Sequence, residues 1–310
     1  MTGDELEVFE AERARLHALA YRMLSSVADA DDVVQETWLR WERLGHGGRS
    51  GVERPAAWLT TTASRIALDV LKSARRQREE YVGPWLPEPL LTGTGSGRFA
   101  GEFASGRSGQ GDPAAAIEWA ESLTLGFLVV LERLSPVERA VFLLADVFGE
   151  PYSAIASVVD RSEDACRQIA TRARQRVRDE RRRVAPVAGA VSATELVQRF
   201  LAACAFGQVD DLRDLLHDDV VLVSDGGRSV HAARRPVVGI DRVSRFLVNV
   251  TGRLTGDVAV DVREVNGEPG LVVSRGGDVT MVMAFEVDGG RIGALRLLLN
   301  PDKLRRVAVH

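Results

Sequence analysis

The sequence contains few of the residues that build disulfide-rich, metal-binding or membrane-spanning proteins. It has two cysteines, Cys166 and Cys204, which lie far apart with no cluster of cysteine or histidine around either. This excludes a disulfide framework and gives no support to a zinc site. Its longest uncharged stretch, residues 184–194, is much shorter than the roughly 20 apolar residues that a membrane-spanning helix needs. The opening residues lack the basic and apolar regions of a secretion signal, so we expect a cytoplasmic protein without a metal, a cofactor or a membrane partner.

Charged residues are plentiful, and they are unevenly distributed. The net charge of the chain is −4, but residues 1–44 carry ten acidic side chains against five arginines. Residues 161–183 reverse this balance, with nine arginines against four acidic side chains. A basic helix beside an acidic segment favours a protein that meets nucleic acid at one surface and another protein at a second. Two solvated helices without partners would give the same pattern.

The spacing of apolar residues divides the chain into three structured parts. Helical spacing predicts one all-helical domain over residues 1–80 and a second over residues 114–184. Residues 81–113 are rich in proline, glycine and serine and predict a flexible linker. Residues 190–310 begin with helical spacing and continue with alternating apolar runs separated by Asn-Gly and Asp-Gly-Gly turns. This order predicts an α+β domain with a mostly antiparallel sheet.

The same spacing predicts the individual elements of this last part. We expect helices at 193–206, 210–216 and 240–251, and strands at 220–223, 258–265, 271–274, 279–287 and 292–299.

Residues 135–182 follow the plan of a helix-turn-helix. Ser135, Pro136 and Glu138 have the spacing of an N-cap, a first helical position and a reciprocal capping residue. We expect this helix to run to about residue 148. A short helix at 153–159, a turn and a long basic helix from residue 163 follow, which is the order of the motif.

The long basic helix has one apolar face and one basic face. The residues expected to pack inward are Cys166, Ile169, Ala170, Ala173 and Val177. Arginine and glutamine near the start of such a helix make paired hydrogen bonds to base edges, and arginines farther along it suit phosphates. The candidate DNA contacts are Arg167, Gln168, Thr171, Arg172, Arg174 and Arg176, with Arg178 as a further phosphate contact. A solvated arginine-rich helix in a bundle is the alternative.

The first helical domain contains two further patterns. Residues 29–41 form an acidic helix with an apolar stripe. Residues 54–78 contain aromatic and hydroxyl groups beside cations, a combination that binding to single-stranded DNA requires. The candidate DNA contacts there are Trp58, Thr61, Thr62, Arg65, Lys72, Arg75 and Arg76. The alternative keeps Trp58 and Leu59 in the core.

In this order, the acidic helix, the aromatic and basic helix and the helix-turn-helix resemble the two domains of bacterial sigma-70 family factors of the extracytoplasmic function (ECF) group. The resemblance covers residues 7–182. It implies partners in promoter DNA and core RNA polymerase, including the β′ and β subunits. Residues 58–76 would read the minus-ten element and residues 163–178 the minus-thirty-five element. The residues that would contact the β′ coiled coil are Asp31, Asp32, Gln35, Glu36 and Trp38.

Three motifs resemble an ECF subgroup that has a C-terminal SnoaL-like extension with a cone-shaped α+β fold. They are Trp85-Leu86-Pro87-Glu88-Pro89, Asp225-Gly226-Gly227-Arg228 and Asn300-Pro301-Asp302-Lys303-Leu304. The resemblance implies that the extension modulates polymerase binding in cis, so that no separate anti-sigma protein is required.

A physical argument adds a mechanism. Trp85 and Leu86 are bulky apolar groups in a segment that cannot form its own core, so they need a pocket. We expect the α+β domain to supply it, with Asp225 and Lys303 at its rim. The alternative is an inert linker, because Asp-Gly-Gly and Asn-Pro-Asp are common turn sequences.

Other SnoaL-like folds are enzymes, which leaves a second function open: a helix-turn-helix regulator with a ligand-sensing or catalytic domain. Candidate acids and bases are Asp225, Glu264, Glu286, His217 and His231. They form no recognisable catalytic motif, so we expect no enzyme, and a pocket for a small-molecule ligand is the more plausible variant.

Overall fold

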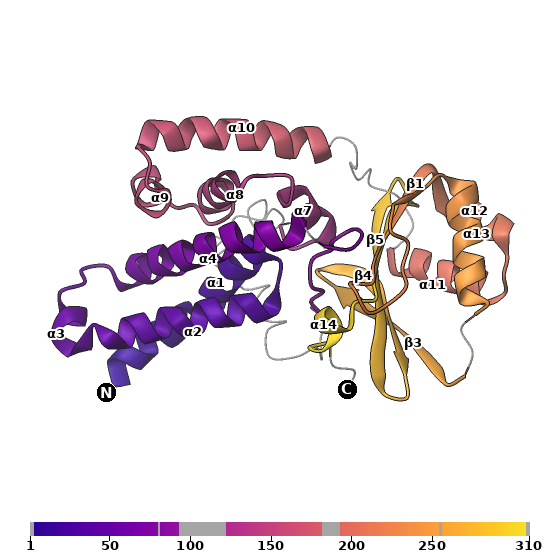
Figure 1. Ribbon diagram of the computed structural model, residues 1–310, viewed down its shortest axis with the longest axis horizontal. Helices are drawn as coiled ribbons and strands as arrows, with labels where there is room; N and C mark the ends of the chain where they lie inside the picture. Colours follow the sequence, from indigo (N-terminus) through magenta and orange to yellow (C-terminus); the bar gives the residue numbers. More distant parts are fainter. Residues whose placement is uncertain (1–2, 80, 93–121, 182–192, 254–255, 308–310) are drawn as a thin grey trace. The chain divides into compact units, whose positions relative to one another are not determined.

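The computed structural model describes residues 3–79, 81–92, 122–181, 193–253 and 256–307. These residues form two compact units (Figure 1). The helical unit contains the described residues within 1–80, 101–123 and 127–180, and the α+β unit contains those within 81–100, 124–126 and 181–310. None of the helices in the described ranges combines the length and the hydropathy needed to cross a bilayer.

The first part of the helical unit is built from α1 (Gly3–Leu24), α2 (Val27–Arg43), α3 (Gly45–Ser50) and α4 (Pro55–Glu79). The side chain of Ser26 caps α2 by accepting a hydrogen bond from the backbone N–H of Asp29 at 3.2 Å. Helices α1, α2 and α4 pack on one another. Their shared core includes the fully buried Leu16, Leu19, Met23, Val33 and Leu59.

The second part of the helical unit contains α7 (Leu125–Leu131) from Phe127 on, α8 (Pro136–Phe142), the π-helical segment η1 (Leu143–Val147), α9 (Tyr152–Val159) and α10 (Glu163–Arg181) up to Glu180. The predicted capping box at Ser135 and Glu138 is confirmed. The predicted helix to residue 148 is continuous, but its last turn is π-helical, with Phe148 N bonded to Leu143 O at 3.0 Å. Asp160, with a φ of 54°, ends α9 and makes the predicted turn.

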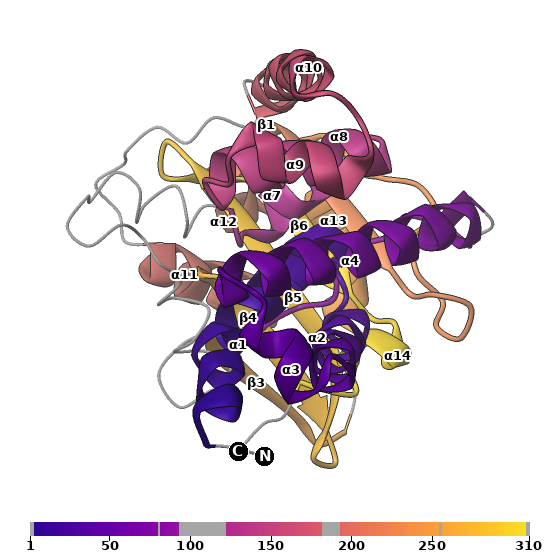
Figure 2. The ribbon, with the colours of Figure 1, turned by 90° about the vertical axis from the view of Figure 1, so that its left-hand side faces the viewer.

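Both parts belong to one unit because α4 packs on α8 and α9. Figure 2 shows α8 and α9 beside α4, with α10 on their far side. The apolar face predicted for α10 is confirmed: Cys166, Ala170, Ala173 and Val177 are buried, and Ile169 is half-buried.

The α+β unit is a six-stranded sheet with helices on one face (Figure 1). Its strands are β1 (Leu216–Asp225), β2 (Val237–Val238), β3 (Val258–Val265), β4 (Glu268–Arg275), β5 (Asp278–Asp288) and β6 (Arg291–Leu298), in the order β2-β1-β6-β5-β4-β3. The helices are α11 (Ala193–Ala205), α12 (Val209–Leu215) and α13 (Ile240–Thr251), followed at the end by α14 (Pro301–Leu304). Residues from α11, α12, α13 and the sheet form one core, in which the rings of Phe200 and Phe285 meet edge to face at 5.1 Å.

The predicted α+β class is confirmed, and so are the bounds of α13 and β3. The sheet is antiparallel except between β1 and β6, which pair in parallel. Asn266 and Gly267 have positive φ angles of 53° and 83°, as a two-residue hairpin turn requires. The prediction did not include α14, although Asn300 caps it and proline occupies its first position. The glycine-rich part of the predicted linker, residues 93–113, and Arg182 lie outside the described residues.

Candidate nucleic-acid interface and buried strap

Helix α2 presents its acidic side chains at the surface of the helical unit. Asp32 and Gln35 are exposed, while Asp31 binds Nε2 of His17 at 2.8 Å. Glu36 binds Nε of Arg40 at 2.8 Å. The ring of Trp38 is half-buried and packs on Phe9, with ring centroids 4.9 Å apart. The five residues expected to contact polymerase therefore lie on one helix, where a hydrogen bond to α1, one ion pair and one aromatic contact position three of them.

The candidate DNA contacts of α4 that carry an aromatic ring or a hydroxyl group are half-buried. The ring of Trp58 packs on Trp41 with centroids 5.3 Å apart, so it belongs partly to the core, as the structural alternative requires. Thr61 and Thr62 are also half-buried, whereas Lys72 is exposed and binds Asp69 at 3.2 Å. Arg75 and Arg76 lie in the last turns of α4, and their side chains are outside the described part of the structure.

Arg65 of α4 binds α9. Its Nε and Nη2 atoms donate to the backbone carbonyl of Ser157 at 3.2 and 2.7 Å. A residue predicted to contact DNA thus also holds the helix-turn-helix to α4 within the helical unit.

The six residues of α10 expected to contact DNA fall into two groups. Gln168, Thr171 and Arg172 are exposed. The others are held by acidic neighbours: Arg167 binds Glu163 at 2.9 Å and Asp164 at 2.8 Å, Arg174 binds Asp146 at 2.7 Å and Arg176 binds Glu138 at 2.7 Å. Hydrogen bonds from Arg174 to Asp146 and to the Tyr152 hydroxyl raise the pKa of Arg174, so its charge is permanent.

Glu138 serves both the cap of α8 and the pairing of Arg176. Partial burial opposes its ionisation, but hydrogen bonds from Ser135 and the charges of Arg176 and Arg172 outweigh burial, so its pKa lies below the ordinary value. The carboxylate is therefore fully charged at neutral pH, where it fixes one arginine of the basic face.

A buried guanidinium joins the two parts of the helical unit. Arg139 is 1% exposed and donates from Nε and Nη2 to the carbonyl of Arg22 at 3.1 and 2.8 Å. That carbonyl lies in the last turn of α1, where backbone acceptors lack helical partners. Arg139 also binds Glu132 and the hydroxyl of Ser25. Sequence reasoning missed this junction, since nothing in the local pattern separates Arg139 from a surface arginine.

Arg22 is itself fully buried beside this junction. It donates to the Ser122 hydroxyl at 2.8 Å and to the carbonyl of Ala18 at 3.3 Å. Burial lowers the pKa of Arg22 to about 9, so the guanidinium stays charged at neutral pH.

In the α+β unit, residues 81–92, which we call the strap, are held by a buried carboxylate. Asp225 is 1% exposed and accepts hydrogen bonds from the Tyr81 hydroxyl at 2.6 Å and the Leu86 backbone N–H at 2.9 Å. It also accepts from Gly227 N at 3.0 Å and pairs with Nζ of Lys303 at 2.7 Å. These donors satisfy the hydrogen-bonding capacity of the buried carboxylate. Burial and the hydrogen bond to Asp225 raise the pKa of Tyr81, which keeps its hydroxyl a donor.

The C-terminal motif completes this contact. Lys303 donates to the carbonyl of Leu86 and lies 4.0 Å from the centroid of the Trp85 ring. Nδ2 of Asn300 donates to the Tyr81 hydroxyl at 2.8 Å. The structure therefore brings residues from all three motifs together, as expected. Among the other residues of the three motifs, those that are exposed are Arg228, Pro301 and Asp302. Those that are buried include Pro87, Glu88, Pro89 and Leu304.

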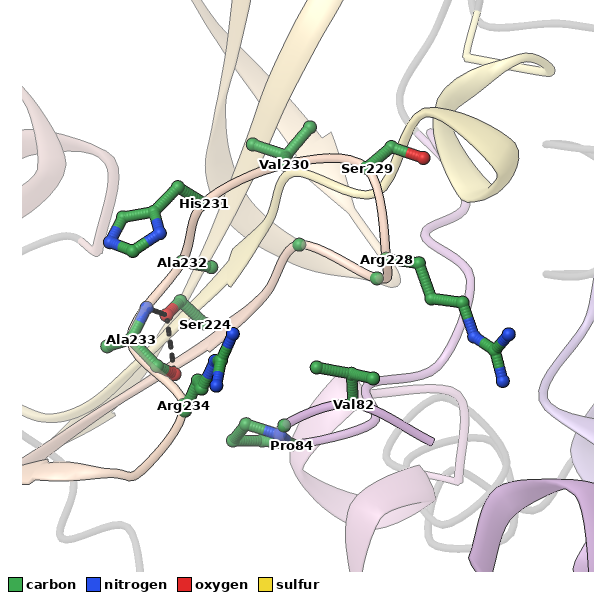
Figure 3. Close-up of a pocket in the computed structure, with 13 residues that line it drawn as sticks. Val82, Pro84, Ser224, Arg228, Ser229, Val230, His231, Ala232, Ala233 and Arg234 are labelled. Atoms are coloured by element: carbon green, nitrogen blue, oxygen red, sulfur yellow. Dashed lines mark hydrogen bonds between the residues drawn. The ribbon is translucent and has the colours of Figure 1, made fainter. Parts of the chain in front are cut away.

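The two glycines of the second motif leave room for this arrangement. A Cβ on Gly227, whose φ is 59°, would lie 2.8 Å from the Asn300 side chain, and a Cβ on Gly226 would lie 2.8 Å from Cβ of Ala232. The loop that they begin forms a pocket of about 150 Å³ with the strap (Figure 3). Figure 3 shows Val82 and Pro84 at one side of this pocket, opposite the loop.

The far end of the strap adds to the edge of the sheet. Leu91 forms an antiparallel bridge with Val265 of β3. Asn266 N donates to Leu90 O at 2.7 Å, and Leu90 N donates to the Asn266 side chain at 2.9 Å. The hydroxyl of Thr92 binds Glu264 at 2.6 Å and accepts from Gly267 N at 2.8 Å. The first residues of the predicted flexible linker are thus anchored at both ends, because the α+β unit supplies the core and the hydrogen bonds that they lack.

The candidate acids and bases of an enzyme do not meet. Asp225 accepts hydrogen bonds from the strap, and Glu264 accepts one from Thr92. Glu286 pairs with Arg296. His217 binds the carbonyl of Asp288 at 2.9 Å, and the exposed His231 lines the small pocket of Figure 3. Among the described residues, no cluster of metal-ligating side chains is found either.

Comparison with protein families defines the class. The family model of Sigma-70 region 2 matches residues 8–77, and that of Sigma-70 region 4 matches residues 126–177. These ranges include α2 and α4 in the first case and the helix-turn-helix in the second. The helical unit therefore carries the two regions of a sigma-70 type factor.

Comparison of the whole chain narrows this class. The chain is 38% identical to the ECF RNA polymerase sigma factor SigJ of Mycobacterium tuberculosis over 96% of this chain and 93% of SigJ. It is 29% identical to "Probable ECF RNA polymerase sigma factor SigI" of the same species, over 96% and 93% of the two chains. The crystal structure of the M. tuberculosis SigJ superposes with a TM-score of 0.71 and 35% identity, covering 97% of this chain and 98% of that one. The chain belongs to the ECF sigma factors: it binds core RNA polymerase and directs promoter-specific initiation of transcription.

Proposed function

We propose that the α+β unit regulates this sigma factor in cis by holding the strap. The strap follows directly on α4, the helix expected to read the minus-ten element, and it leads toward the segment matched as region 4. Whatever fixes the strap therefore restricts the connection between the two promoter-reading regions. The observation that carries the proposal is the buried carboxylate of Asp225, which holds Tyr81, Leu86 and Lys303 at once.

Energetics support a contact that is stable but reversible. The Tyr81 hydroxyl and the Leu86 amide each donate to the Asp225 carboxylate, and a hydrogen bond to a charged group contributes about 1.5–3 kcal/mol, so the docked strap is preferred. The strap buries few large side chains, chiefly Leu86 and Leu90. A partner that binds the undocked strap needs to replace only the contacts of this small apolar surface and the hydrogen bonds to the Asp225–Lys303 pair.

The same proposal assigns the surfaces of the helical unit. The acidic side chains of α2 form the contact with the β′ subunit, α4 reads the minus-ten element and α10 reads the minus-thirty-five element. On α10, exposed Gln168 and Arg172 make direct contacts, while Arg174 and Arg176 are oriented by Asp146 and Glu138. Regulation in cis makes a separate anti-sigma protein unnecessary and requires no catalysis. The factor works in the cytoplasm, with the polymerase.

Transcription in vitro with purified core polymerase tests the regulatory role. The full chain is compared with Asp225→Asn and Lys303→Met, which break the same buried pair, and with Asp302→Asn as a control. Asp302 lies in the same motif, but its side chain is exposed. In the described part of the structure, its carboxylate pairs with Arg305. We expect Asp225→Asn and Lys303→Met to change promoter-dependent transcription in the same direction, and Asp302→Asn to leave it unchanged. Equal transcript yields from all four proteins at every polymerase concentration contradict regulation through the strap.

A second comparison tests promoter reading. Gln168→Ala should weaken transcription only at promoters with an intact minus-thirty-five element, by about 1–3 kcal/mol for a base contact. Arg172→Ala should weaken it at all promoters alike, with a smaller dependence on salt, as loss of a phosphate contact does. Equal losses for Gln168→Ala on intact and altered upstream elements contradict its assignment.

A further inference from the structure

The α+β unit contains an apolar cavity that the strap does not fill. Its volume is about 410 Å³, and it lies between α13 on one side and β4, β5 and β6 on the other. Phe246, Val250, Val279, Met281 and Leu299 are among the side chains that line it. Apolar cavities of about 150 Å³ already accept a benzene-sized molecule, and ligand sites usually measure about 300–1,000 Å³.

The polar groups of the cavity wall define the ligand class. The hydroxyl of Thr251 donates to the Leu247 carbonyl at 2.8 Å, and that of Thr280 donates to the Val273 carbonyl at 3.2 Å. Both hydroxyls are thus used within the fold. The lining contains no aspartate, glutamate or histidine, and its one charged residue, Arg275, is exposed at the rim. A neutral and predominantly apolar molecule matches this wall, because a buried charge would have no partner there.

One wall of the cavity belongs to the helix that clamps the strap. Pro301 and Leu304 of α14 line the cavity, and Leu304 is 4% exposed. Lys303, between them on the same single turn, holds Leu86 and Asp225. Asn300 caps this turn and also donates to the Tyr81 hydroxyl. We therefore expect a displacement of Leu304 to move Lys303 and Asn300, which hold the strap.

We propose that this cavity binds one small, neutral, mostly apolar molecule, and that its occupancy stabilises the docked strap by supporting Leu304 and Pro301. This inference rests on the proposed regulatory role of the strap for its biological meaning, but the binding site does not depend on that role. A ligand that packs against α14 gives Leu304 contacts that an empty cavity lacks, and these contacts keep Lys303 at the carbonyl of Leu86.

The binding test uses the full chain and N-phenyl-1-naphthylamine, a neutral aromatic amine that fluoresces in apolar surroundings. We expect saturable enhancement at one site per chain. Val250→Phe and Val279→Phe, which fill the cavity from opposite walls, should each weaken binding about tenfold. Val260→Phe is the matched control, because Val260 is 41% exposed on β3 and does not line the cavity. Circular dichroism checks that each variant is folded.

Hydrogen exchange of the strap tests the coupling. The amides of Leu86 and Leu90 are bonded to Asp225 and Asn266, so peptides covering residues 81–92 report docking. We expect the probe to slow their exchange several-fold in the full chain and in Val260→Phe. In Lys303→Met the probe should bind equally well without slowing exchange, because the connection from α14 to the strap is lost.

The outcomes separate the two parts of the inference from the proposed function. Absence of saturable binding, or undiminished binding in both cavity-filling variants, overturns the site. Saturable binding with unchanged strap exchange overturns the coupling. If the probe binds and slows exchange of the strap, both the binding site and its coupling to the strap are supported. This holds even where Asp225→Asn leaves transcription unchanged. That last result overturns only the regulatory role of the strap.

Discussion

The two units each bury a charge where segments far apart in the sequence meet, and they surround it differently. In the helical unit, the guanidinium of Arg139 lies between α1 and the segment before α8, both of which contribute buried apolar side chains such as Leu19 and Leu131. In the α+β unit, the carboxylate of Asp225 holds the strap, whose described residues form no helix and only one isolated bridge. Loss of the first charge therefore disturbs a core, whereas loss of the second frees a segment from a sheet that remains folded.

The largest effect is expected for Arg139→Met. The substitution removes the donor of two hydrogen bonds to the Arg22 carbonyl and the buried cation paired with Glu132, which should lower the free energy of unfolding by about 3–5 kcal/mol. Urea unfolding followed by the tryptophans of α2 and α4 measures this change. Arg133→Met is the control, because Arg133 is exposed nearby. A transition midpoint equal to that of the control would contradict the structural role of Arg139.

Asp225→Ala should have a large effect on the strap and a smaller one on the rest of its unit. Because the strap can be released from the sheet, the ammonium group of Lys303 becomes exposed to solvent, and the cost of an unpaired buried charge is avoided. We expect exchange of the Leu86 amide to accelerate toward that of an open chain, while amides of β5 and β6 stay protected. Exchange that accelerates across the whole sheet would show that Asp225 belongs to the core of the unit, and the contrast with Arg139 would fail.

Much of this architecture follows from local sequence signals. The capping box at Ser135, the turn at Asp160 and the hairpin at Asn266 are short-range patterns with fixed spacing, and each is present as predicted. The helix at 240–251 and the strand at 258–265 have clear apolar periodicity and the predicted bounds.

The remaining features depend on contacts between distant residues. The parallel pairing of β1 with β6 joins segments that no local pattern relates. Arg22 and Arg139 are buried although arginine is mostly exposed in proteins, because each has a partner far along the chain: Ser122 for Arg22 and the Arg22 carbonyl for Arg139. The three motifs predicted which segments contact one another around the strap. They did not predict that Asp225 is the buried carboxylate that accepts hydrogen bonds from the strap.

A moderate effect is expected at the second anchor of the strap. Thr92→Val removes a hydroxyl that donates to Glu264 and accepts from Gly267 N, each hydrogen bond contributing about 0.5–1.5 kcal/mol. Exchange at Leu90 should accelerate, while exchange at Leu86 changes little because Asp225 still holds that end. Thr92→Ser keeps the hydroxyl and should restore protection. Equal acceleration at both ends would indicate that the strap docks as a single cooperative segment.

The smallest effect concerns a carboxylate that is neither buried like Asp225 nor fully exposed. The pKa of Glu138 lies below its ordinary value of 4.5, despite partial burial, because of Ser135 and the nearby arginines. A carboxylate with a lowered pKa stabilises the folded state above its ordinary pKa, and this stability is lost as the pH falls through the lowered value. Glu138→Gln keeps the capping hydrogen bond but loses the pairing with Arg176, so it should destabilise the helical unit by a few tenths to about 1 kcal/mol at pH 7.

The pH dependence separates this pairing from the cap. The difference in urea midpoint between Glu138→Gln and the unaltered chain should shrink as the pH falls below 4.5. Glu138→Ala also loses the reciprocal hydrogen bond from the Ser135 backbone N–H, which adds about 0.5–1.5 kcal/mol at every pH. If the cost of Glu138→Gln is instead independent of pH, the carboxylate acts through its shape and hydrogen bonds alone. Its charge would then have no part in fixing Arg176, and the ordering of the basic face of α10 would rest on Asp146 and Arg174.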